Sequence, residues 1–340
     1  MTEAAGPVIE IAGLTKRYGD LVAVNEISFT VARGEVFGIL GPNGAGKTTT
    51  LEMVEGLRRP DGGTIVVDGT PVWPNPKAVK SRIGVQLQAT ALFDYQKLHE
   101  IIYIFGSCYG IHRSRPECVA LLSRVGLEEK ADAYAYELSG GQAQRLSIAL
   151  ALVNDPIVTF LDEPTTGLDP RARRALWEVI EQISHSGTTV VLTTHYMEEA
   201  ERLCDRVAVM DLGRIMALDV PRVLVNSLGA EATITFTLDE EASLPDLCEL
   251  DGVSNCDALV DERGYSIVAD DAQCAVISLL DLAAERRLTV RNLDVKGANL
   301  EDVFLHMTGR KLSDDDEAAL EPEPVGSAKR RRRGLRGSGR

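Results

Sequence analysis

The sequence predicts an α/β fold built on a mainly parallel β-sheet, and three observations support this. An apolar strand pattern over Gly34–Leu40 runs directly into a glycine-rich loop and then into a helix. Alternation of strand and helix patterns resumes at Ile157 and continues to about Leu228. The strands are apolar on both faces, which is typical of parallel sheets that are covered by helices on both sides.

The first part of the chain contains short β-rich segments and then a helical region. Val8–Leu14 and Val24–Val31 precede the strand at Gly34–Leu40, and Gly63–Gly69 reads as another strand between glycine residues. From about Ala91 to Leu152 the pattern becomes mostly helical. We therefore expect residues 91–152 to form a helical lobe that is inserted into the α/β domain.

The second part of the chain continues the alternation and then changes character. Strands are expected at Ile157–Asp162, Thr188–Thr194 and Leu212–Asp219. Helices are expected between and after them, at Pro170–Ser184, from Tyr196 and at Pro221–Leu228. After them, the segments EATITFTL, GYSIVAD and LTVRNLDV read as strands, with a helix over Ala272–Arg287. We therefore divide the chain into an α/β domain at 1–228, a small α+β domain at 229–312, and a charged tail at 313–340 that is predicted to be disordered.

The composition limits the classes of function. The net charge is −15, although seven basic residues gather in Lys329–Arg340, so the rest of the chain is more acidic still and should repel nucleic acid. The apolar segment Ile101–Ile111 is too short to span a bilayer, and the N-terminus lacks the features of a signal peptide. The six cysteines have no C-x-x-C spacing. We therefore expect reduced thiols, no zinc site and a cytoplasmic protein.

The glycine-rich loop fits the pattern G-x-x-x-x-G-K-[ST], which binds phosphates through backbone N–H groups at the start of a helix. Lys47 is expected to neutralise the β- and γ-phosphates, and the Thr48 hydroxyl to reach Mg²⁺. The residues expected to contact ATP here are Gly41, Pro42, Asn43, Gly44, Ala45, Gly46, Lys47, Thr48 and Thr49.

Two acids follow an apolar strand at the segment IVTFLDEP. Asp162 and Glu163 come at the carboxyl end of that strand, where ligands bind in parallel sheets. We expect Asp162 to hold Mg²⁺ and Glu163 to take a proton from an attacking water. Acids in this position also serve as helix N-caps, but together with the phosphate loop they indicate catalysis.

Four further side chains are candidates for the same site. His195 ends another apolar strand and is expected to contact the γ-phosphate, although a lone histidine is often structural. Gln88 follows a predicted strand and is expected to contact Mg²⁺ and the water, with Gln86 as the alternative by register. Tyr18 is expected to stack on adenine, and core packing is its alternative role.

A second glycine turn, Ser139–Gln142, opens another helix in the segment ELSGGQAQRLSIALAL. A serine and glycine amides at a helix N-terminus form an anion site, but one nucleotide needs only one phosphate cradle. A plain capped helix is the alternative reading of this turn.

The phosphate loop, LSGGQ, LDEP, GLDP (Gly167–Pro170) and His195, in this order, resemble the nucleotide-binding domain of ABC ATPases. The resemblance covers about Val8–Leu228. It implies a RecA-like core, an N-terminal antiparallel β subdomain and a helical lobe. It also implies that two such domains pack head to tail, so that Ser139, Gly140, Gly141 and Gln142 contact the ATP that is held by Lys47 of a second copy, while Asp169 links the two sites.

Two longer segments narrow the resemblance. TTHYMEEAERLCDRVAVMDLGRI and Lys296–Arg310 resemble the ATPases of ABC-2-type exporters, including the daunorubicin-type drug-resistance group; for Lys296–Arg310 the alternative is an ordinary amphipathic helix capped by Asn299. This implies a homodimer that uses ATP and Mg²⁺, docks through its helical lobe on a separately encoded permease at the inner face of the membrane, and exports a drug, lipid or other hydrophobic cargo. An importer ATPase, or a soluble ABC ATPase acting on nucleic acid or ribosomes, is the alternative. The basic tail is expected to be a solvated charge run, a membrane-surface contact or a nucleic-acid contact.

Overall fold

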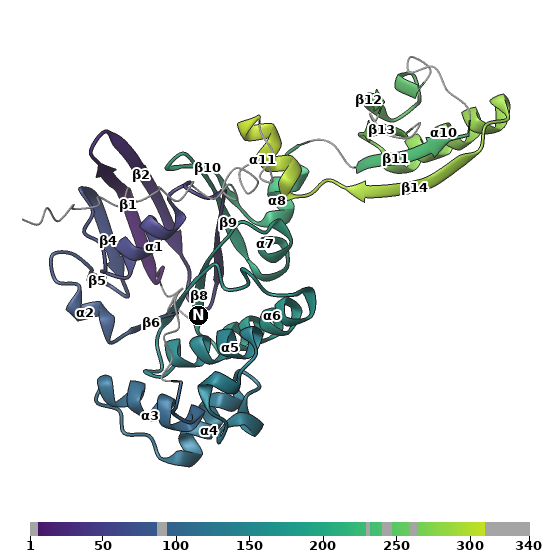
Figure 1. The fold of residues 1–340 in the computed structure, drawn as a ribbon. Helices are drawn as coiled ribbons and strands as arrows, with labels where there is room; N and C mark the ends of the chain where they lie inside the picture. Colours follow the sequence, from purple (N-terminus) through teal and green to yellow (C-terminus); the bar gives the residue numbers. More distant parts are fainter. Residues whose placement is uncertain (1–5, 87–93, 229–231, 240–246, 259–263, 310–340) are drawn as a thin grey trace, which may run out of the picture.

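The computed structural model describes residues 6–86, 94–228, 232–239, 247–258 and 264–309. These residues form three β-sheets and the helices that pack against them (Figure 1). The central sheet has the strand order β10-β9-β3-β8-β7-β6, and all its neighbouring pairs are parallel except β10 with β9. Its strands are β3 (Val36–Leu40), β6 (Ile83–Val85), β7 (Val158–Asp162), β8 (Thr189–Thr194), β9 (Arg206–Asp211) and β10 (Arg214–Asp219).

An antiparallel sheet covers one side of the main body, as the resemblance to ABC ATPases implies for the N-terminal region. Its order is β2-β1-β4-β5, with β1 at Ile9–Tyr18, β2 at Leu21–Val31, β4 at Gly62–Val67 and β5 at Thr70–Pro71. The two faces of β3 show how the layers share the central sheet. Phe37 and Ile39 pack with the antiparallel sheet and α1 (Lys47–Val54), whereas Val36 and Leu40 pack with the helices on the opposite face.

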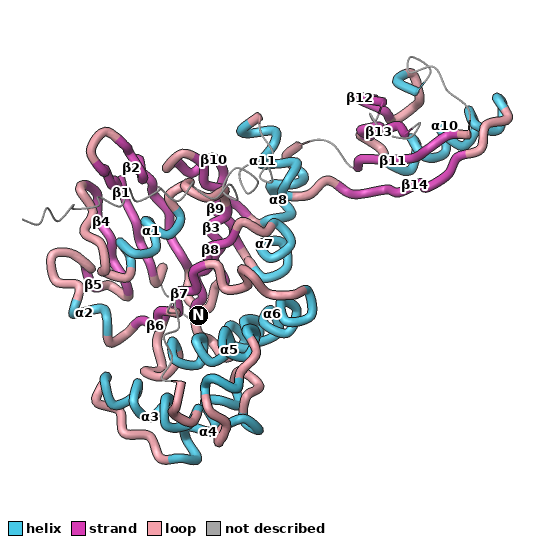
Figure 2. The backbone as a smooth tube through the Cα atoms, in the orientation of Figure 1, coloured by secondary structure: helices cyan, strands magenta, loops and turns pink. Residues whose placement is uncertain are grey.

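The helices of that opposite face include a lobe between β6 and β7. Its elements are α3 (Leu98–Cys108), α4 (Arg115–Ser123), two short 3₁₀ turns (Glu128–Lys130 and Ala135–Glu137) and α5 (Gly140–Ala151). The other helices are α6 (Pro170–His185), α7 (Met197–Leu203) and α8 (Pro221–Asn226), and α2 (Lys77–Lys80) lies before β6. Figure 2 shows α3 and α4 below the central sheet, with α5 and α6 between them and the strands.

The C-terminal region forms a separate four-stranded antiparallel sheet that projects from the main body (Figure 2). Its order is β12-β13-β11-β14, and α10 (Ala272–Arg286) packs on it. The strands are β11 (Ala232–Leu238), β12 (Val253–Ala258), β13 (Gly264–Ala269) and β14 (Val290–Gly297).

The last described helix, α11 (Leu300–Thr308), does not pack on this small sheet. Leu300, Val303 and Phe304 are fully buried in the core of the main body. The Leu300 amide donates to Oε1 of Glu201 on α7 at 2.7 Å. The chain therefore leaves the main body for the small sheet and then returns to it, although sequence patterns grouped α11 with the small domain.

The expectation that all cysteines are reduced thiols is wrong for one pair. Cys248 and Cys256 form a disulfide, with their Cα atoms 5.4 Å apart. The chain turns back through Gly252, which has a left-handed φ of 81°, and this turn carries Cys256 on β12 past Cys248. The pairing depends on that reversal, so cysteine spacing alone does not reveal it.

Candidate functional site

The phosphate loop, Gly41–Thr48, joins the end of β3 to the start of α1. Two of its glycines have no room for a side chain. A Cβ atom at Gly41 would lie 2.1 Å from the Met210 carbonyl oxygen, and one at Gly46 would lie 2.4 Å from that of Ala23. Gly46 also has a φ of 101°, which side-chain-bearing residues rarely adopt. The neighbouring strands therefore hold this loop in a single shape that only glycine permits.

Lys47 lies at the centre of the loop and is almost fully buried. Its Nζ atom donates to the carbonyl oxygens of Gly41 at 2.8 Å and Pro42 at 3.0 Å. The same atom lies 3.2 Å from Oε1 of Glu163. The ammonium group is thus surrounded by acceptors, and a phosphate oxygen can take the place of the Glu163 carboxylate as its charged partner.

Asp162 and Thr48 meet from two different elements. Thr48 lies on the first turn of α1 and its hydroxyl donates to Oδ1 of Asp162 at 3.3 Å. The Thr193 hydroxyl, from β8, donates to the same oxygen. Burial raises the pKa of Asp162, against the effect of these two hydroxyl groups. The hydroxyl of Thr48 and the carboxylate of Asp162 are the hard oxygen donors that suit Mg²⁺ when phosphate and water supply the remaining ligands.

Glu163 follows directly and has a left-handed backbone, with a φ of 44°. Its amide donates to Oγ1 of Thr193 at 3.0 Å, which fixes this conformation. Oε1 faces Lys47, and Oε2 lies 3.3 Å from Nδ1 of His195. The adjacent His195 ring, followed by Lys47, lowers the pKa of Glu163 to about 2. Glu163 is therefore a carboxylate at neutral pH, held between the two basic groups.

The structure thus brings together five residues that the sequence predicted for one site. Lys47 and Thr48 come from the phosphate loop, Asp162 and Glu163 from the end of β7, and His195 from the end of β8. The His195 ring contacts Tyr196, with 4.0 Å between ring centroids. Parallel strands place their carboxyl ends at one edge of the sheet, which explains why residues so far apart in sequence meet here.

Gln88 lies outside the described residues, so its position stays a prediction. Gln86 is buried, and its backbone amide donates to the Phe160 carbonyl oxygen at 3.0 Å. It lines a pocket of about 150 Å³ together with Thr48 and Asp162. Gln86 therefore approaches the predicted metal site from the side of β6.

Glu55 lines the same pocket and was missed by sequence reasoning. Burial, with the nearby Asp162 and Glu52 carboxylates, raises the pKa of Glu55 to about 8. No local pattern marks this residue, because a glutamate near the end of a helix is ordinary. Only the packing of α1 against β6 and β7 makes it a buried acid.

Tyr18 lies at the end of β1, and 41% of the residue is exposed. Lys16 Nζ lies 5.7 Å from the centre of its ring, and Arg58 Cζ lies 5.4 Å from it. The ring therefore lies at the surface near two cations, and not in the core. Its contact with adenine stays a prediction.

The second glycine turn is built differently from the phosphate loop. The Ser139 hydroxyl caps α5 by accepting from the backbone amide of Gln142 at 3.4 Å. In return, the backbone amide of Ser139 donates to the side-chain oxygen Oε1 of Gln142 at 3.0 Å. Ser139 and Gly140 are exposed, and a Cβ atom at Gly140 would meet nothing within 4 Å. In the part of the chain that the structure describes, the hydrogen bonds of Ser139 stay within its own turn. This half of the predicted site is open to solvent.

Gly141 and Asp169 connect this turn to α6. A Cβ atom at Gly141 would lie 2.9 Å from Cβ of Ala172, so the two helix starts pack closely. Asp169 caps α6 by accepting from the amides of Arg171 and Ala172, each at 2.9 Å. Asp169 is exposed and has at least this structural role.

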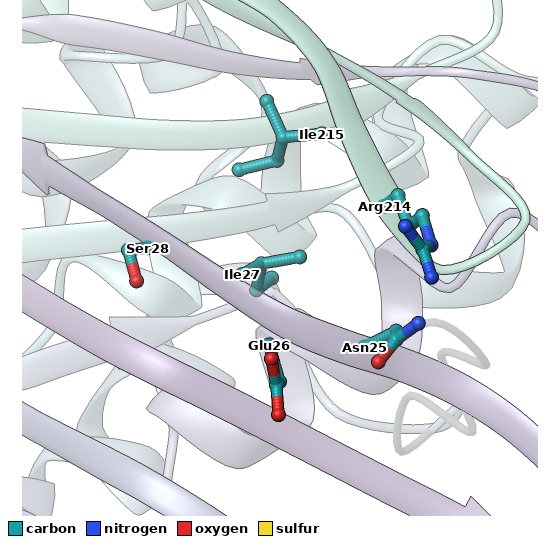
Figure 3. A pocket seen from close by; sticks show the side chains of 6 residues that line it. All are labelled: Asn25, Glu26, Ile27, Ser28, Arg214 and Ile215. Carbon is teal, nitrogen blue, oxygen red and sulfur yellow. The ribbon is translucent and has the colours of Figure 1, made fainter.

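A pocket of about 420 Å³ lies between β2 and β10 (Figure 3). Asn25 and Arg214 lie close together at one end of it, and Ile27 and Ile215 extend between the strands. None of the residues lining this pocket belongs to the predicted site.

Comparisons with known proteins agree with this geometry. A model of the ABC transporter family matches residues 24–166. The Nod factor export ATP-binding protein I of Burkholderia lata is 42% identical over 309 residues, which cover 90% of this chain and 98% of that protein. Its counterpart in Paraburkholderia xenovorans is 42% identical over 321 residues, which cover 92% of this chain and 100% of that protein.

Solved structures match the main body. CbiO1 from Clostridium perfringens, part of the ABC transporter complex cbiONQ, is 29% identical, with a TM-score of 0.60 over 65% of this chain and 92% of that one. A bacterial ABC transporter cassette solved as a dimer, MJ0796, is 26% identical, with a TM-score of 0.56 over 62% of this chain and 98% of that one. The sequence relatives thus span nearly the whole chain, whereas the solved structures span about two-thirds of it.

Proposed function

Because the chain belongs to the ABC transporter family of ATP-binding proteins, whose members couple ATP hydrolysis to transport, we propose that it is the ATP-hydrolysing subunit of a membrane exporter. The observation that carries this proposal is the cluster at the sheet edge, in which Lys47 and His195 hold the Glu163 carboxylate beside Asp162 and Thr48. The names of the relatives, which refer to export, favour an exporter over an importer.

The geometry suggests how the residues share the work of hydrolysis. When the γ-phosphate enters the loop, Lys47 turns from Glu163 to the phosphate oxygens, and Oε1 of Glu163 becomes free to accept a proton from water. His195 stays at the other carboxylate oxygen and is placed to contact the γ-phosphate. Thr48 and Asp162 would hold Mg²⁺, which would supply positive charge at the phosphates.

The second glycine turn is explained by a dimer. Ser139 and the amides of Gly140 and Gly141 present an anion site to solvent at the start of α5. In two copies packed head to tail, each turn faces the γ-phosphate that lies on the other copy's phosphate loop. ATP then joins the two copies, and hydrolysis releases them. The existence of a dimeric relative, MJ0796, supports this arrangement.

Substitution Glu163→Gln tests the proposal. The variant should bind ATP and dimerise, but hydrolyse ATP at least about 100-fold more slowly, because the amide cannot accept the proton. Turnover is measured by phosphate release, and dimerisation by light scattering with saturating ATP. Glu35→Gln is a matched control, since Glu35 is also a buried acid but lies outside the site. A Glu163→Gln variant that stays monomeric at saturating ATP would count against the dimer mechanism.

The membrane partner is part of the same proposal. No helix in the described part of the chain is long and apolar enough to cross a bilayer. We place the protein at the inner face of the membrane, bound through its helical lobe to a separately encoded permease that selects a drug, lipid or other hydrophobic cargo. Affinity purification of the tagged chain from membranes should recover an integral membrane protein. Recovery of ribosomes or DNA-repair proteins in its place would support a soluble role.

The basic tail, Lys329–Arg340, lies outside the described residues, and its role is tested separately. If it is a membrane-surface contact, its deletion should reduce the fraction of the ATPase that sediments with anionic vesicles in the absence of permease. Unchanged sedimentation would reject that role and leave a solvated charge run or a nucleic-acid contact.

A further inference from the structure

Glu199, on α7, is a fully buried acid that the proposed roles do not use. Its Oε1 atom accepts a hydrogen bond from Nε1 of Trp177 at 3.2 Å. Burial raises the pKa of Glu199, while the neighbouring hydroxyls of Thr194 and Thr165 act in the opposite direction. A buried carboxyl group is costly unless polar partners surround it. The nearest polar groups come from three segments of the chain, but only the Trp177 indole is hydrogen-bonded to the carboxyl group: Oε2 of Glu199 and Oγ1 of Thr165 have no hydrogen-bond partner among the residues that the structure describes.

Those segments are the ones that carry the predicted site. Thr165 follows Glu163 by two positions, and Thr194 directly precedes His195. Trp177 lies on α6, the helix that Asp169 caps. The Glu199 carboxyl group therefore lies where the chain after Glu163, the chain before His195 and the helix after Asp169 meet.

A second set of contacts supports the same junction from the side of His195. Cζ of Arg173, on α6, lies 4.4 Å from the centre of the Tyr196 ring, and that ring contacts His195. The Tyr196 amide donates to Oγ1 of Thr194 at 2.9 Å, which fixes the turn that carries His195. The charge of Arg173 also acts on Glu199 and lowers its pKa. Displacement of α6 would therefore move the His195 ring in two ways. Arg173 would shift the Tyr196 ring that contacts His195, and Trp177 would shift Glu199 and with it the start of α7.

The helix of the second glycine turn reaches the junction as well. Nε2 of Gln144, on α5, donates to the carbonyl oxygen of Pro164 at 2.6 Å. Pro164 lies between Glu163 and Thr165. Both helix starts that are exposed at the predicted dimer contact, those of α5 and α6, are thus connected to the segment that follows Glu163.

We propose that Glu199 is a positioning residue for ATP hydrolysis, which fixes the start of α7, and His195 just before it, against α6 and passes a displacement of α6 to His195. An apolar side chain of similar size would pack in this space, but it would not bind the Trp177 indole group on α6. This inference rests on the proposed roles of Glu163 and His195. It implies that closure of the dimer at Asp169 aligns the catalytic groups, so that hydrolysis follows closure.

The first test is Glu199→Gln, which keeps the shape and an acceptor for Trp177 but puts an NH₂ group in place of one carboxyl oxygen. Turnover should fall roughly tenfold, because small misplacements of reacting groups have effects of this size or larger. Affinity for a fluorescent ATP analogue and the melting temperature should stay close to wild type. Glu35→Gln, at a buried acid bonded to Arg206 and the Ala32 amide, is the matched control and should keep normal turnover.

The second test combines Glu199→Gln with His195→Ala. If Glu199 acts through His195, the double variant should be no slower than His195→Ala alone, whereas the effects of independent residues multiply. Multiplying effects, or normal turnover in Glu199→Gln beside an impaired His195→Ala, would overturn the inference and leave the proposed function standing. Normal turnover in His195→Ala would overturn the proposed role of His195 and this inference with it.

A spectroscopic measurement covers the case in which the variant is too unstable for kinetics. Trp177 and Trp73 are the two tryptophans of the chain, so a Trp73→Phe background leaves Trp177 as the single reporter. In the Glu163→Gln, Trp73→Phe protein, ATP should change the Trp177 emission as α6 moves, and adding Glu199→Asp, which shortens the side chain, should reduce that change at least about twofold. An equal ATP response with and without Glu199→Asp would contradict the proposal.

Discussion

The two glycine turns of this chain have similar sequences but opposite surroundings. In the phosphate loop, Gly41 and Gly46 are pressed against backbone carbonyl groups, and Lys47 is already bound to acceptors. In the second turn, Ser139 and Gly140 are exposed, and Gly140 has no neighbour where its side chain would be. The first turn is organised by its own chain, and the second is open to solvent, as the proposed dimer requires. The difference teaches that a motif match identifies chemistry, whereas packing shows whether one chain suffices to perform it.

A mixing experiment would test most directly whether the two turns belong to one composite site. Lys47→Ala, at the phosphate loop, and Ser139→Arg, at the second turn, should each lower ATP hydrolysis by about 100-fold or more. Mixed in equal amounts, these inactive variants should recover about a quarter of wild-type activity, because half of the dimers are mixed and each of those keeps one intact site. Phosphate release measures the recovery.

The control for that experiment uses two variants on the same half of the site. Lys47→Ala mixed with Glu163→Gln should recover nothing, since both changes damage the phosphate-loop half in their own chain and no intact site can form. Absence of recovery in the first mixture as well would show that the two turns do not belong to one composite site.

The two turns should also differ in how much a glycine substitution destabilises the fold. Gly46→Ala should lower the free energy of unfolding by about 3 kcal/mol, because a Cβ atom there would lie 2.4 Å from the Ala23 carbonyl oxygen and the backbone has a φ of 101°. Gly140→Ala, with open space around it, should change stability by less than about 0.5 kcal/mol. Urea denaturation of both variants, without nucleotide, measures the difference. Equal losses would mean that the second turn is as constrained as the first.

The phosphate-loop half also contains buried acids that make it sensitive to pH. The pKa of Glu55 is raised from 4.5 to about 8, so the folded protein binds a proton that the unfolded chain has released between these values. The stability that comes from this proton is present below pH 4.5 and is lost as the pH rises through 8. Glu55→Gln should therefore stabilise the protein by about 4 kcal/mol at pH 8, and by less than about 1 kcal/mol at pH 5. Denaturation at both pH values tests this, and an equal gain at both would contradict it.

The smallest expected effect concerns the cap that adjoins the second turn. Asp169→Ala removes the acceptor for the amides of Arg171 and Ala172 and should cost about 1 kcal/mol of stability. Asp169→Asn keeps an acceptor and should cost less, so it separates the cap from any contact across the dimer. If Asp169→Asn is stable but slow in ATP hydrolysis, the residue has a role beyond capping. Thermal denaturation and phosphate release provide the two measurements.

Local chemistry explains how much of the site was predictable. Gly41–Thr48 and Asp162–Glu163 lie at strand ends, and the order of strands in a parallel sheet brings such ends together, so the sequence predicts both the residues and their meeting. The α/β fold class is confirmed by the family match and by the solved relatives. Strand β9 was not predicted, because its apolar run Arg206–Asp211 is separated from β10 only by the tight turn at Leu212 and Gly213.

What escaped prediction depends on contacts between distant segments. Glu55 becomes a buried acid only because β6 and β7 close over α1, and Glu199 only because α6 and α7 meet. The disulfide of Cys248 depends on a chain reversal, and β12 is an edge strand with many polar residues, so its pattern is weak. None of these features has a local signal in the sequence.

The return of α11 to the main body has a consequence for biosynthesis. Phe304 and Val303 complete a core whose other members, such as Leu203 and Leu224, are translated much earlier. While the small sheet is being synthesised, the apolar surface that awaits α11 remains exposed to solvent and to chaperones. The core of the nascent protein can therefore be completed only after α11 has left the ribosome, later than the synthesis of the whole small sheet.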